Sequence, residues 1–212
     1  MFFKKLFSKK PSKEEIEKMA EKYRGLVPFN PSKAPEITEV VTVSFQTDAG
    51  DLIIEVYPQA APNAAHRFIE LVKTGFYDGT PIFRVVNKPR PFVAQFGINW
   101  RPEHKKWQHD NFDDDPSLFQ LLPGTLAFAK AGPNTNSTQI FINYGDNSFL
   151  KDNGGFSTFA RVTQGYEIAA SFVSVGSPDM GLDQGQLWNN GGKYLESLPQ
   201  KPNMILRAQV IG

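Results

Sequence analysis

The sequence predicts a mainly β protein, a closed and mostly antiparallel barrel capped by two helices, with an N-terminal helical extension. Two observations support this fold class. Many short runs rich in β-branched and aromatic residues alternate with turn residues, and only two stretches among them have helical spacing. The first 39 residues differ from the rest, because they begin with a basic segment and end in a Pro-rich one. We therefore divide the chain into a basic N-terminal arm, residues 1–39, and a barrel domain, residues 40–212.

The N-terminal arm is predicted to contain one short amphipathic helix. Residues 1–24 hold eight Lys or Arg and four Glu, which leaves a local charge of +4. A helix over residues 13–24 is predicted by four apolar residues at helical spacing: Ile16, Met19, Ala20 and Tyr23. Three prolines then form a linker: Pro28, Pro31 and Pro35. Residues 1–24 fit two interpretations, a solvated and partly frayed tail, or weak contact with an anionic membrane surface or a partner protein.

The barrel domain begins with a hairpin followed by a helix. Residues 41–47 and 51–57 alternate between apolar and polar residues, as two antiparallel strands do, and Asp48-Ala-Gly50 supplies the turn between them. Pro62 then opens a helix that Gly75 closes.

Six further strand-like runs follow, with a second helix before the last of them. The strands are predicted at residues 81–86, 91–98, 124–129, 139–142, 156–162 and 205–212, and the helix at residues 166–175. Two long connections remain, residues 99–123 and 175–203. Connections of that length are usually functional or packed over a site.

Composition argues against several classes of function. A net charge of +1 gives no reason to expect nucleic acid as a partner. The chain has no Cys, so disulfides, thiolate nucleophiles and Cys-ligated zinc are excluded. Its three His have no metal-binding spacing, and we expect neither a metal nor a cofactor. No apolar run at the N-terminus is long enough for a secretion signal or a transmembrane segment, so we expect a cytoplasmic protein.

The stretch AGPNTNSTQIFI, residues 131–142, joins a shaped loop to a strand. Gly, Pro and Asn favour turns, whereas Gln139-Ile-Phe-Ile142 has the composition of a half-buried strand. Taken alone, this stretch fits either an ordinary hairpin connection or the wall of a ligand groove.

Four motifs in this order resemble the cyclophilins, a family of peptidyl-prolyl cis/trans isomerases. They are APNAAHRFIELVKTGFYDGTPIFRVV, PFVAQFGI, GTLAFAKAGPNTNSTQIFI and FLKDNGGFSTFARV. The resemblance runs from about Val41 to the C-terminus and is strongest to a bacterial-type branch, on the segments QFGI, FINYGDN and DQGQLWNNGGKYL. It implies an eight-stranded antiparallel barrel closed by two helices. It also implies isomerisation of X–Pro bonds in unfolded or loop segments, which assists protein folding.

The chemistry of this reaction needs neither a nucleophile nor a metal. The barrier of about 18–20 kcal/mol arises from the loss of amide resonance, so a catalyst must bind the twisted amide better than the planar forms. A fixed cationic donor aimed at the prolyl nitrogen, beside an apolar pocket for the ring, meets this requirement. Arg84 in PIFRVV is the candidate donor, although an arginine on a strand more commonly pairs with a surface carboxylate.

The resemblance implies specific roles for residues of the groove. Arg84 stands where the family has its catalytic arginine, and Gln95 where it has the glutamine that helps to hold the substrate carbonyl and orients the arginine. The residues implied to bind substrate are Phe92, Val93, Phe141 and Leu150 in the proline pocket, Ala129, Lys130 and Ala131 along the peptide backbone, and Gln139, Phe149 and Phe156 elsewhere in the groove.

Four departures from the family pattern affect this assignment. Lys130 stands where many relatives have Asn, and Phe156 where many have His. Phe149 replaces a tryptophan whose indole N–H binds cyclosporin, so we expect activity with weakened cyclosporin binding. The connection NKPRP, residues 87–91, is longer than usual and bears Lys88 and Arg90. This loop is able to shift Phe92 relative to Arg84, and it adds positive charge near the groove.

Three functional hypotheses follow. The first is an isomerase acting on proline-containing peptides or unfolded proteins, and we expect it to be a monomer. The second is a non-catalytic module that binds Pro-containing peptides, but retention of both Arg84 and Gln95 favours the enzyme. In the third, the protein is a tethered factor that works through the basic arm, and deletion of residues 1–35 would then spare activity on a small peptide.

Overall fold

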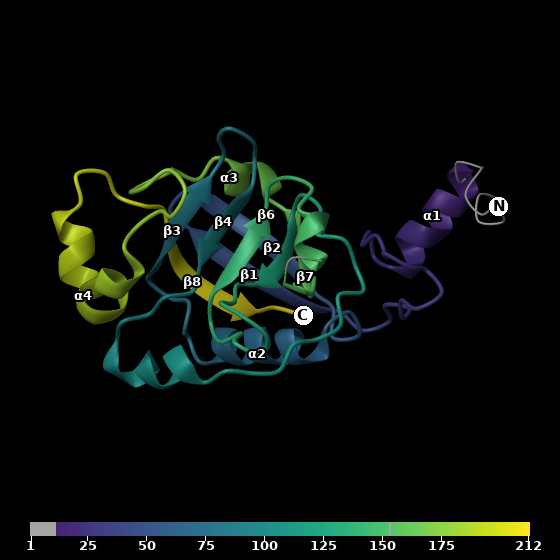
Figure 1. The fold of residues 1–212 in the computed structure, drawn as a ribbon, viewed down its shortest axis with the longest axis horizontal. Coiled ribbons are helices and arrows are strands. Elements are labelled where there is room, and N and C mark those ends of the chain that lie inside the picture. The colour runs from purple at the N-terminus through teal and green to yellow at the C-terminus, as the bar shows by residue number, and fades with distance from the viewer. Residues whose placement is uncertain (1–11, 153) are drawn as a thin grey trace.

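The computed structural model describes residues 12–152 and 154–212, and within them it contains a closed antiparallel barrel of eight strands (Figure 1). The strands are β1 (Val41–Thr47), β2 (Gly50–Val56), β3 (Thr80–Val86), β4 (Val93–Phe96), β5 (Thr125–Phe128), β6 (Ile140–Asn143), β7 (Ala160–Gln164) and β8 (Met204–Val210). They pair in the closed order β1-β2-β7-β5-β6-β4-β3-β8. The predicted fold class is therefore confirmed, with β7 beginning four residues later than the sequence pattern indicates.

The described helices lie outside the barrel wall. They are α1 (Lys13–Lys22), α2 (Pro62–Lys73), α3 (Tyr166–Ala170) and α4 (Gln184–Ser197), with two 3₁₀ helices, η1 (Pro102–His109) and η2 (Ser148–Lys151). In α2, Pro62 occupies the first turn, where its missing N–H is harmless. The Asp115 carboxylate accepts from the Asn63 and Ala64 N–H groups at 3.1 and 2.9 Å, which satisfies two free donors of that turn.

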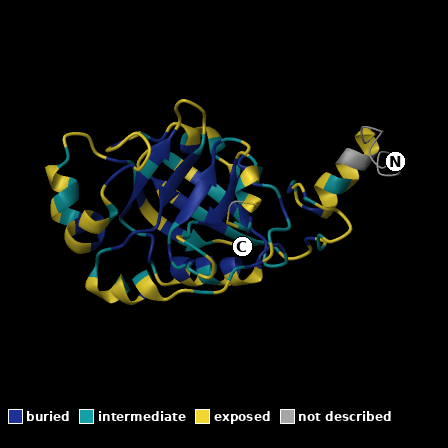
Figure 2. Cartoon of the chain, in the orientation of Figure 1, coloured by how far each residue is buried: buried dark blue, intermediate teal, exposed yellow. Residues whose placement is uncertain are grey.

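The strands of the barrel consist largely of buried residues, coloured dark blue in Figure 2. One face of α2 covers an end of the barrel with a stripe of buried residues: Ala64, Ala65, Phe68, Leu71 and Val72. Within this stripe Phe68 packs on the rings of Phe45, Tyr77 and Phe159, whose centroids lie 5.3–5.9 Å from its own. Because the inward-facing side chains of the described strands pack against one another as a core, we expect a binding site on the outer face of the wall.

The segment 175–203 is not the plain connection that the sequence indicates, because it contains α4. Asp183 caps this helix by accepting from the Gln186 N–H at 2.8 Å. The helix is kinked at Asn190, and Gly191 lies directly against the indole of Trp100, where a Cβ would overlap the ring. The second predicted helix, α3, ends at Ala170 instead of residue 175.

The described part of the N-terminal arm continues from α1 onto the barrel. Pro28 and Phe119 form a β-bridge, with the Phe29 N–H donating to Leu118 O and the Gln120 N–H to Val27 O at 2.9 and 2.8 Å. A separate apolar cluster holds this contact, formed by Tyr23, Leu26, Ile37, Tyr57, Ala60 and Phe119. Residues 1–11 lie outside the described residues, so the membrane or partner contact considered for them stays a prediction. Among the residues that are described, no helix is long and apolar enough to span a membrane.

Candidate active site

The groove lies on the outer face of β4, β5 and β6. Side chains of a strand alternate between two faces, so Ala94 and Phe96 of β4 enter the barrel core while Val93 and Gln95 face outward. The outward residues do not face water alone. A second buried apolar cluster covers this side of the sheet, formed by Val93, Leu121, Ala127 and Phe141. The sheet is thus apolar on both faces here, which indicates a ligand-binding floor.

A register shift brings Arg84 to this face. The pairing of β3 with β4 is irregular between Ile82 and Arg84, and Arg84 then stands opposite Gln95. The Arg84 Nη1 donates to Gln95 Oε1 at 2.9 Å, and its Nε donates to the backbone carbonyl of Asp179 at 2.7 Å. Two fixed acceptors therefore hold the guanidinium. Its plane also lies near Phe92, with Cζ 5.7 Å from the ring centroid.

Three glutamine side chains continue from Arg84 across the groove. The Gln95 Nε2 donates to Gln139 Oε1 at 2.8 Å, and the Gln139 Nε2 donates to Gln184 Oε1 at 3.0 Å. Gln184 is the first residue of α4, so this row of hydrogen bonds joins β3 and β4 to the segment that the sequence treats as a connection. Burial lowers the pKa of the Arg84 guanidinium from its ordinary value, with Asp179 opposing the shift. Because that ordinary value lies far above neutrality, the group stays a cation.

An apolar pocket of about 180 Å³ opens beside the guanidinium. It is lined by Arg84, Phe92, Val93, Gln95, Ala129, Lys130, Phe141, Leu150, Phe156 and Gln184. Nine of these ten positions are among the site residues predicted from the sequence. The aromatic walls are ordered against each other, with the Phe141 and Phe156 rings edge to face at 5.7 Å.

A larger cavity of about 390 Å³ adjoins this apolar pocket. The two share Gln95, Ala129, Lys130 and Gln184, and the larger one is completed by Ala131, Thr135, Ser137, Gln139 and Met180. Ala131 and Gln139, both predicted from the sequence, thus line this adjoining cavity rather than the apolar pocket. Phe149 lines neither of them; it lies at the rim with 41% of its surface exposed.

Lys130 is tied into the protein and is not free to meet a ligand. Only 3% of its side chain is exposed, and its Nζ lies 2.7 Å from Asp114 Oδ2. Burial raises the pKa of the Asp114 carboxyl, but hydrogen bonds from Lys130, Asn134 and Asn136 outweigh it, so the pKa lies below its ordinary value. Lys130 and Asp114 therefore form a neutralised pair beside the groove, with the ammonium 5.5 Å from the Phe156 ring centroid.

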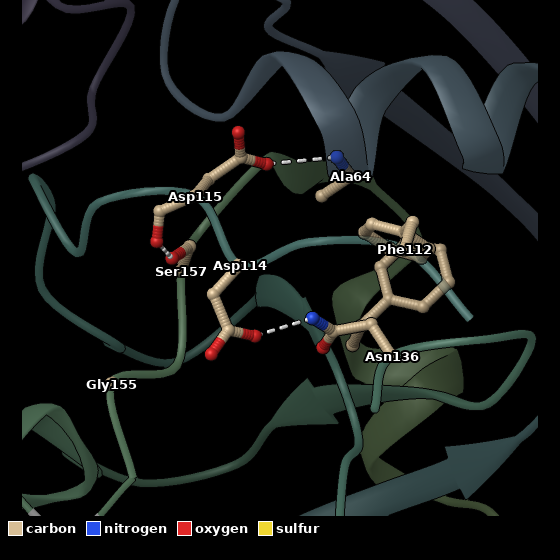
Figure 3. Close-up of a pocket in the computed structure, with 8 residues that line it drawn as sticks. Ala64, Phe112, Asp114, Asp115, Asn136, Gly155 and Ser157 are labelled. Atoms are coloured by element: carbon tan, nitrogen blue, oxygen red, sulfur yellow. Dashed lines mark hydrogen bonds between the residues drawn. The ribbon is translucent and has the colours of Figure 1, made fainter. Parts of the chain in front are cut away.

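A third pocket, shown in Figure 3, is structural in character. Its volume is about 10 Å³, roughly enough for one water molecule. The polar groups around it already bond to one another: Asn136 Nδ2 donates to Asp114 Oδ1 at 2.6 Å, and Ser157 Oγ donates to the Asp115 carbonyl at 2.5 Å (Figure 3). These bonds connect the loop that carries Asp114 to the loop 131–138 and to Ser157, and the Asp115 carboxylate connects it to α2, so they fix one side of the groove.

Four residues that line the groove were not among the predicted site residues. Thr135 and Ser137 lie in the stretch 131–142, whereas Met180 and Gln184 come from the segment 175–203, where neither lies in a run with a regular pattern. The dipeptide Asp183-Gln184 does open a capped helix, and this is the signal that could have located α4. No group of acidic, His or Cys side chains in residues 12–152 and 154–212 is suited to hold a metal ion.

Comparison with known proteins agrees with this geometry. Residues 42–183 match the family model described as cyclophilin type peptidyl-prolyl cis-trans isomerase/CLD. The chain is 35% identical over 133 residues to the peptidyl-prolyl cis-trans isomerase ppi1 of Schizosaccharomyces pombe, covering 61% of this chain and 83% of that one. It is 29% identical over 192 residues to the peptidyl-prolyl cis-trans isomerase A of Dickeya dadantii, covering 88% and 92%.

A solved structure has the same fold. The crystal structure of a cyclophilin type peptidyl-prolyl cis-trans isomerase of Cryptosporidium parvum superposes with a TM-score of 0.60 at 21% identity, over 82% of this chain and 99% of that one. The same protein has been crystallised in the presence of the dipeptide Ala-Pro. The relatives come from bacteria and from eukaryotes. On the family match and the shared barrel, this chain belongs to the cyclophilin-type peptidyl-prolyl cis-trans isomerase family.

Proposed function

We propose that the chain catalyses cis/trans rotation about X–Pro bonds, with Arg84 and Gln95 as its catalytic residues. The observation that carries this proposal is the position of Arg84. Its guanidinium is held by the Asp179 carbonyl and by Gln95 Oε1 at the edge of an apolar pocket of about 180 Å³. A proline ring in that pocket would bring the imide nitrogen close to a fixed cation.

The physical basis is selective binding of the twisted amide. As the bond rotates, resonance is lost and the prolyl nitrogen regains a lone pair, for which the Arg84 N–H groups are donors. In either planar form the lone pair is delocalised, so this hydrogen bond forms fully only during rotation. The aromatic walls around Phe92 and Phe141 hold the ring while the preceding carbonyl turns. No proton is transferred, and the reaction requires no cofactor.

We assign to Gln95 the binding of the substrate carbonyl that precedes the proline. One N–H of the Gln95 amide group already donates to Gln139, which leaves the second for a substrate oxygen. Along the peptide backbone we propose Ala129, Lys130 and Ala131. The N–H groups of Ala129 and Ala131 already donate to the Gln139 carbonyl and to Thr135 Oγ1, so their carbonyls are the groups offered to an extended peptide.

The substrates we propose are proline-containing segments of unfolded or loop regions, so the protein assists folding. Phe149 offers no indole donor, and weakened cyclosporin binding remains our expectation. The monomeric state, the cytoplasmic location and the division into an arm and a barrel domain at residue 39 also remain predictions from the sequence.

The test is cis-to-trans exchange in an Ala-Pro peptide, measured by NMR exchange or a coupled protease. We expect strong acceleration by the wild type and a loss of about 10²- to 10³-fold in kcat/KM for Arg84→Ala, the size typical of removing one such donor. Arg207→Ala is the matched control, because Arg207 is an exposed arginine on β8, away from the groove.

The outcomes distinguish the enzyme from its alternative. A folded wild-type protein that binds the peptide without accelerating exchange would support the non-catalytic binding module instead. Acceleration that survives Arg84→Ala would leave the activity in place and overturn the role of Arg84.

A further inference from the structure

The loop 87–91 between β3 and β4 is exposed but firmly attached to the pocket wall. The Phe92 N–H donates to the Val86 carbonyl at 2.9 Å and closes the loop. The Phe92 carbonyl in turn accepts from the Tyr144 N–H and from Asn147 Nδ2, both at 2.8 Å. Since Phe92 lines the apolar pocket, the loop is held at a fixed place on its rim.

The Arg90 side chain stacks over two aromatic rings at this rim. Its Cζ lies 5.0 Å from the ring centroid of Phe149 and 6.0 Å from that of Phe92. Phe92 is a wall of the pocket, and Phe149 immediately precedes Leu150, another wall residue. Stacking on two rings restricts the guanidinium without using its N–H donors, which lie in the guanidinium plane and remain available.

Arg90 has no carboxylate partner within residues 12–152 and 154–212. The Asp146 carboxylate, on the neighbouring loop, is engaged by the Ser148 N–H at 3.0 Å. The other cations of the groove differ in this respect. Arg84 donates to Gln95 and Asp179, and Lys130 is paired with Asp114 and almost fully buried.

The position of Arg90 relative to the two cavities indicates which flank of a bound peptide it would contact. The apolar pocket and the adjoining cavity share Gln95, Ala129, Lys130 and Gln184. Arg90 contacts the apolar pocket at Phe92, which the adjoining cavity does not include. A peptide with its proline in the apolar pocket and one flank in the adjoining cavity therefore extends its other flank toward Arg90.

We propose that Arg90 is a specificity-determining residue that favours an acidic side chain within two residues of the substrate proline, on the flank that points away from the adjoining cavity. This inference rests on the proposed function, because it concerns the substrate of the same site. A guanidinium with free N–H groups pairs well with a carboxylate, and its stacked position reduces the entropy lost on pairing. The contact is at the surface, so its effect is modest and sensitive to salt.

The test measures kcat/KM for Ala-Pro peptides that carry Glu, Gln or Lys directly before or directly after the Ala-Pro pair. For the wild type we expect Glu to be favoured over Gln about two- to fivefold at one flank, with a smaller preference in high salt. Arg90→Gln should abolish this preference. Lys88→Gln removes an equal charge from the same loop, at a residue with no ring contact among the described residues, and should keep most of the preference.

Three outcomes would overturn the assignment of Arg90. They are a wild type with no charge preference at either flank, a preference that persists in Arg90→Gln, and an equal loss of activity on all the peptides. The last would mean that Arg90 only supports Phe92. The neutral Gln peptides test the proposed function separately. If they show no turnover, the same Glu-to-Gln comparison is made on dissociation constants from NMR titration.

Discussion

The N-terminal arm and the segment 175–203 both lie outside the barrel, yet they contact the groove differently, the arm through apolar packing and the segment through hydrogen bonds. They lie on opposite sides of the barrel (Figure 1). The segment 175–203 makes polar contacts with the site, through the Asp179 carbonyl on Arg84 and Gln184 on Gln139. The arm makes an apolar one, because Phe29 packs against the cluster that forms the pocket floor. We expect the first contact to orient Arg84 and Gln139, and the second to maintain the shape of the pocket.

Among changes within these two regions, the largest effect should follow from moving the turn that holds Arg84. Gly181 has φ +70° and lies against the backbone of Phe83 and Arg84, where a Cβ would overlap both residues. Gly181→Ala must displace the turn and its Asp179 carbonyl. A hydrogen bond to a charged group contributes about 1.5–3 kcal/mol, so kcat/KM should fall roughly ten- to a hundredfold.

The control for this substitution is Gly192→Ala. Gly192 lies in the same segment, but an added Cβ there meets only the Trp100 Nε1, at an ordinary 3.7 Å. Exchange kinetics should distinguish the two variants. Full activity in Gly181→Ala would show that the segment 175–203 does not position Arg84.

A smaller effect is expected at the far end of the glutamine row. Gln184→Ala removes the acceptor for Gln139 and leaves Arg84 and Gln95 in place. The loss of one neutral hydrogen bond of about 0.5–1.5 kcal/mol predicts a decrease of roughly two- to tenfold in kcat/KM. Gln186→Ala is the matched control, since the Gln186 side chain bonds only to Asn190 on the same helix. Equal rates for the two variants would show that Gln184 does not help to orient Arg84 and Gln95.

The arm should affect stability more than rate. Phe29 is partly buried, with Lys151 Nζ 4.4 Å from its ring centroid. Phe29→Ala should lower the free energy of unfolding by about 1–3 kcal/mol, less than a fully buried Phe, and raise KM about twofold. Val27→Ala, at an exposed position of the same segment, is the control in chemical denaturation. A large fall in kcat for Phe29→Ala would contradict the expectation that the arm maintains only the shape of the pocket.

The smallest effect is expected from removing the start of the chain. Deletion of residues 1–17 leaves the contacts of Tyr23, Pro28 and Phe29 intact, so peptide isomerisation should stay within about twofold of the wild type. Deletion of residues 1–35 removes those contacts and should lower the free energy of unfolding at least as much as Phe29→Ala does. Under the tethered-factor hypothesis, activity on a small peptide survives this longer deletion, and that expectation stays a prediction. A fall in activity with the shorter deletion would assign residues 1–17 a part in the site.

The sequence predicted the residues that line the apolar pocket better than the residues that hold them in place. The strands followed from alternation, and the resemblance located Arg84, Gln95 and the aromatic pocket, because those residues lie within ordered motifs. Asp179, Gln184 and Phe29 were missed as contributors to the groove, because each acts through a contact far away in the chain: Asp179 with Arg84, Gln184 with Gln139, and Phe29 with the apolar floor. The α4 helix was hidden by Gly191 and Gly192, which disfavour a helix locally, although Gly191 allows close packing on Trp100.

The row of glutamines also has a direction. A guanidinium can only donate, so Gln95 must turn its oxygen toward Arg84 and its NH₂ group toward Gln139. Gln139 must then accept from Gln95 and donate to Gln184 in the same sense. A single cation thus sets the orientation of three uncharged amide groups. The row of hydrogen bonds ends with the NH₂ group of Gln184 at the start of α4. Without Arg84, the guanidinium would no longer fix the direction of these hydrogen bonds, and each amide group could turn its oxygen toward either neighbour.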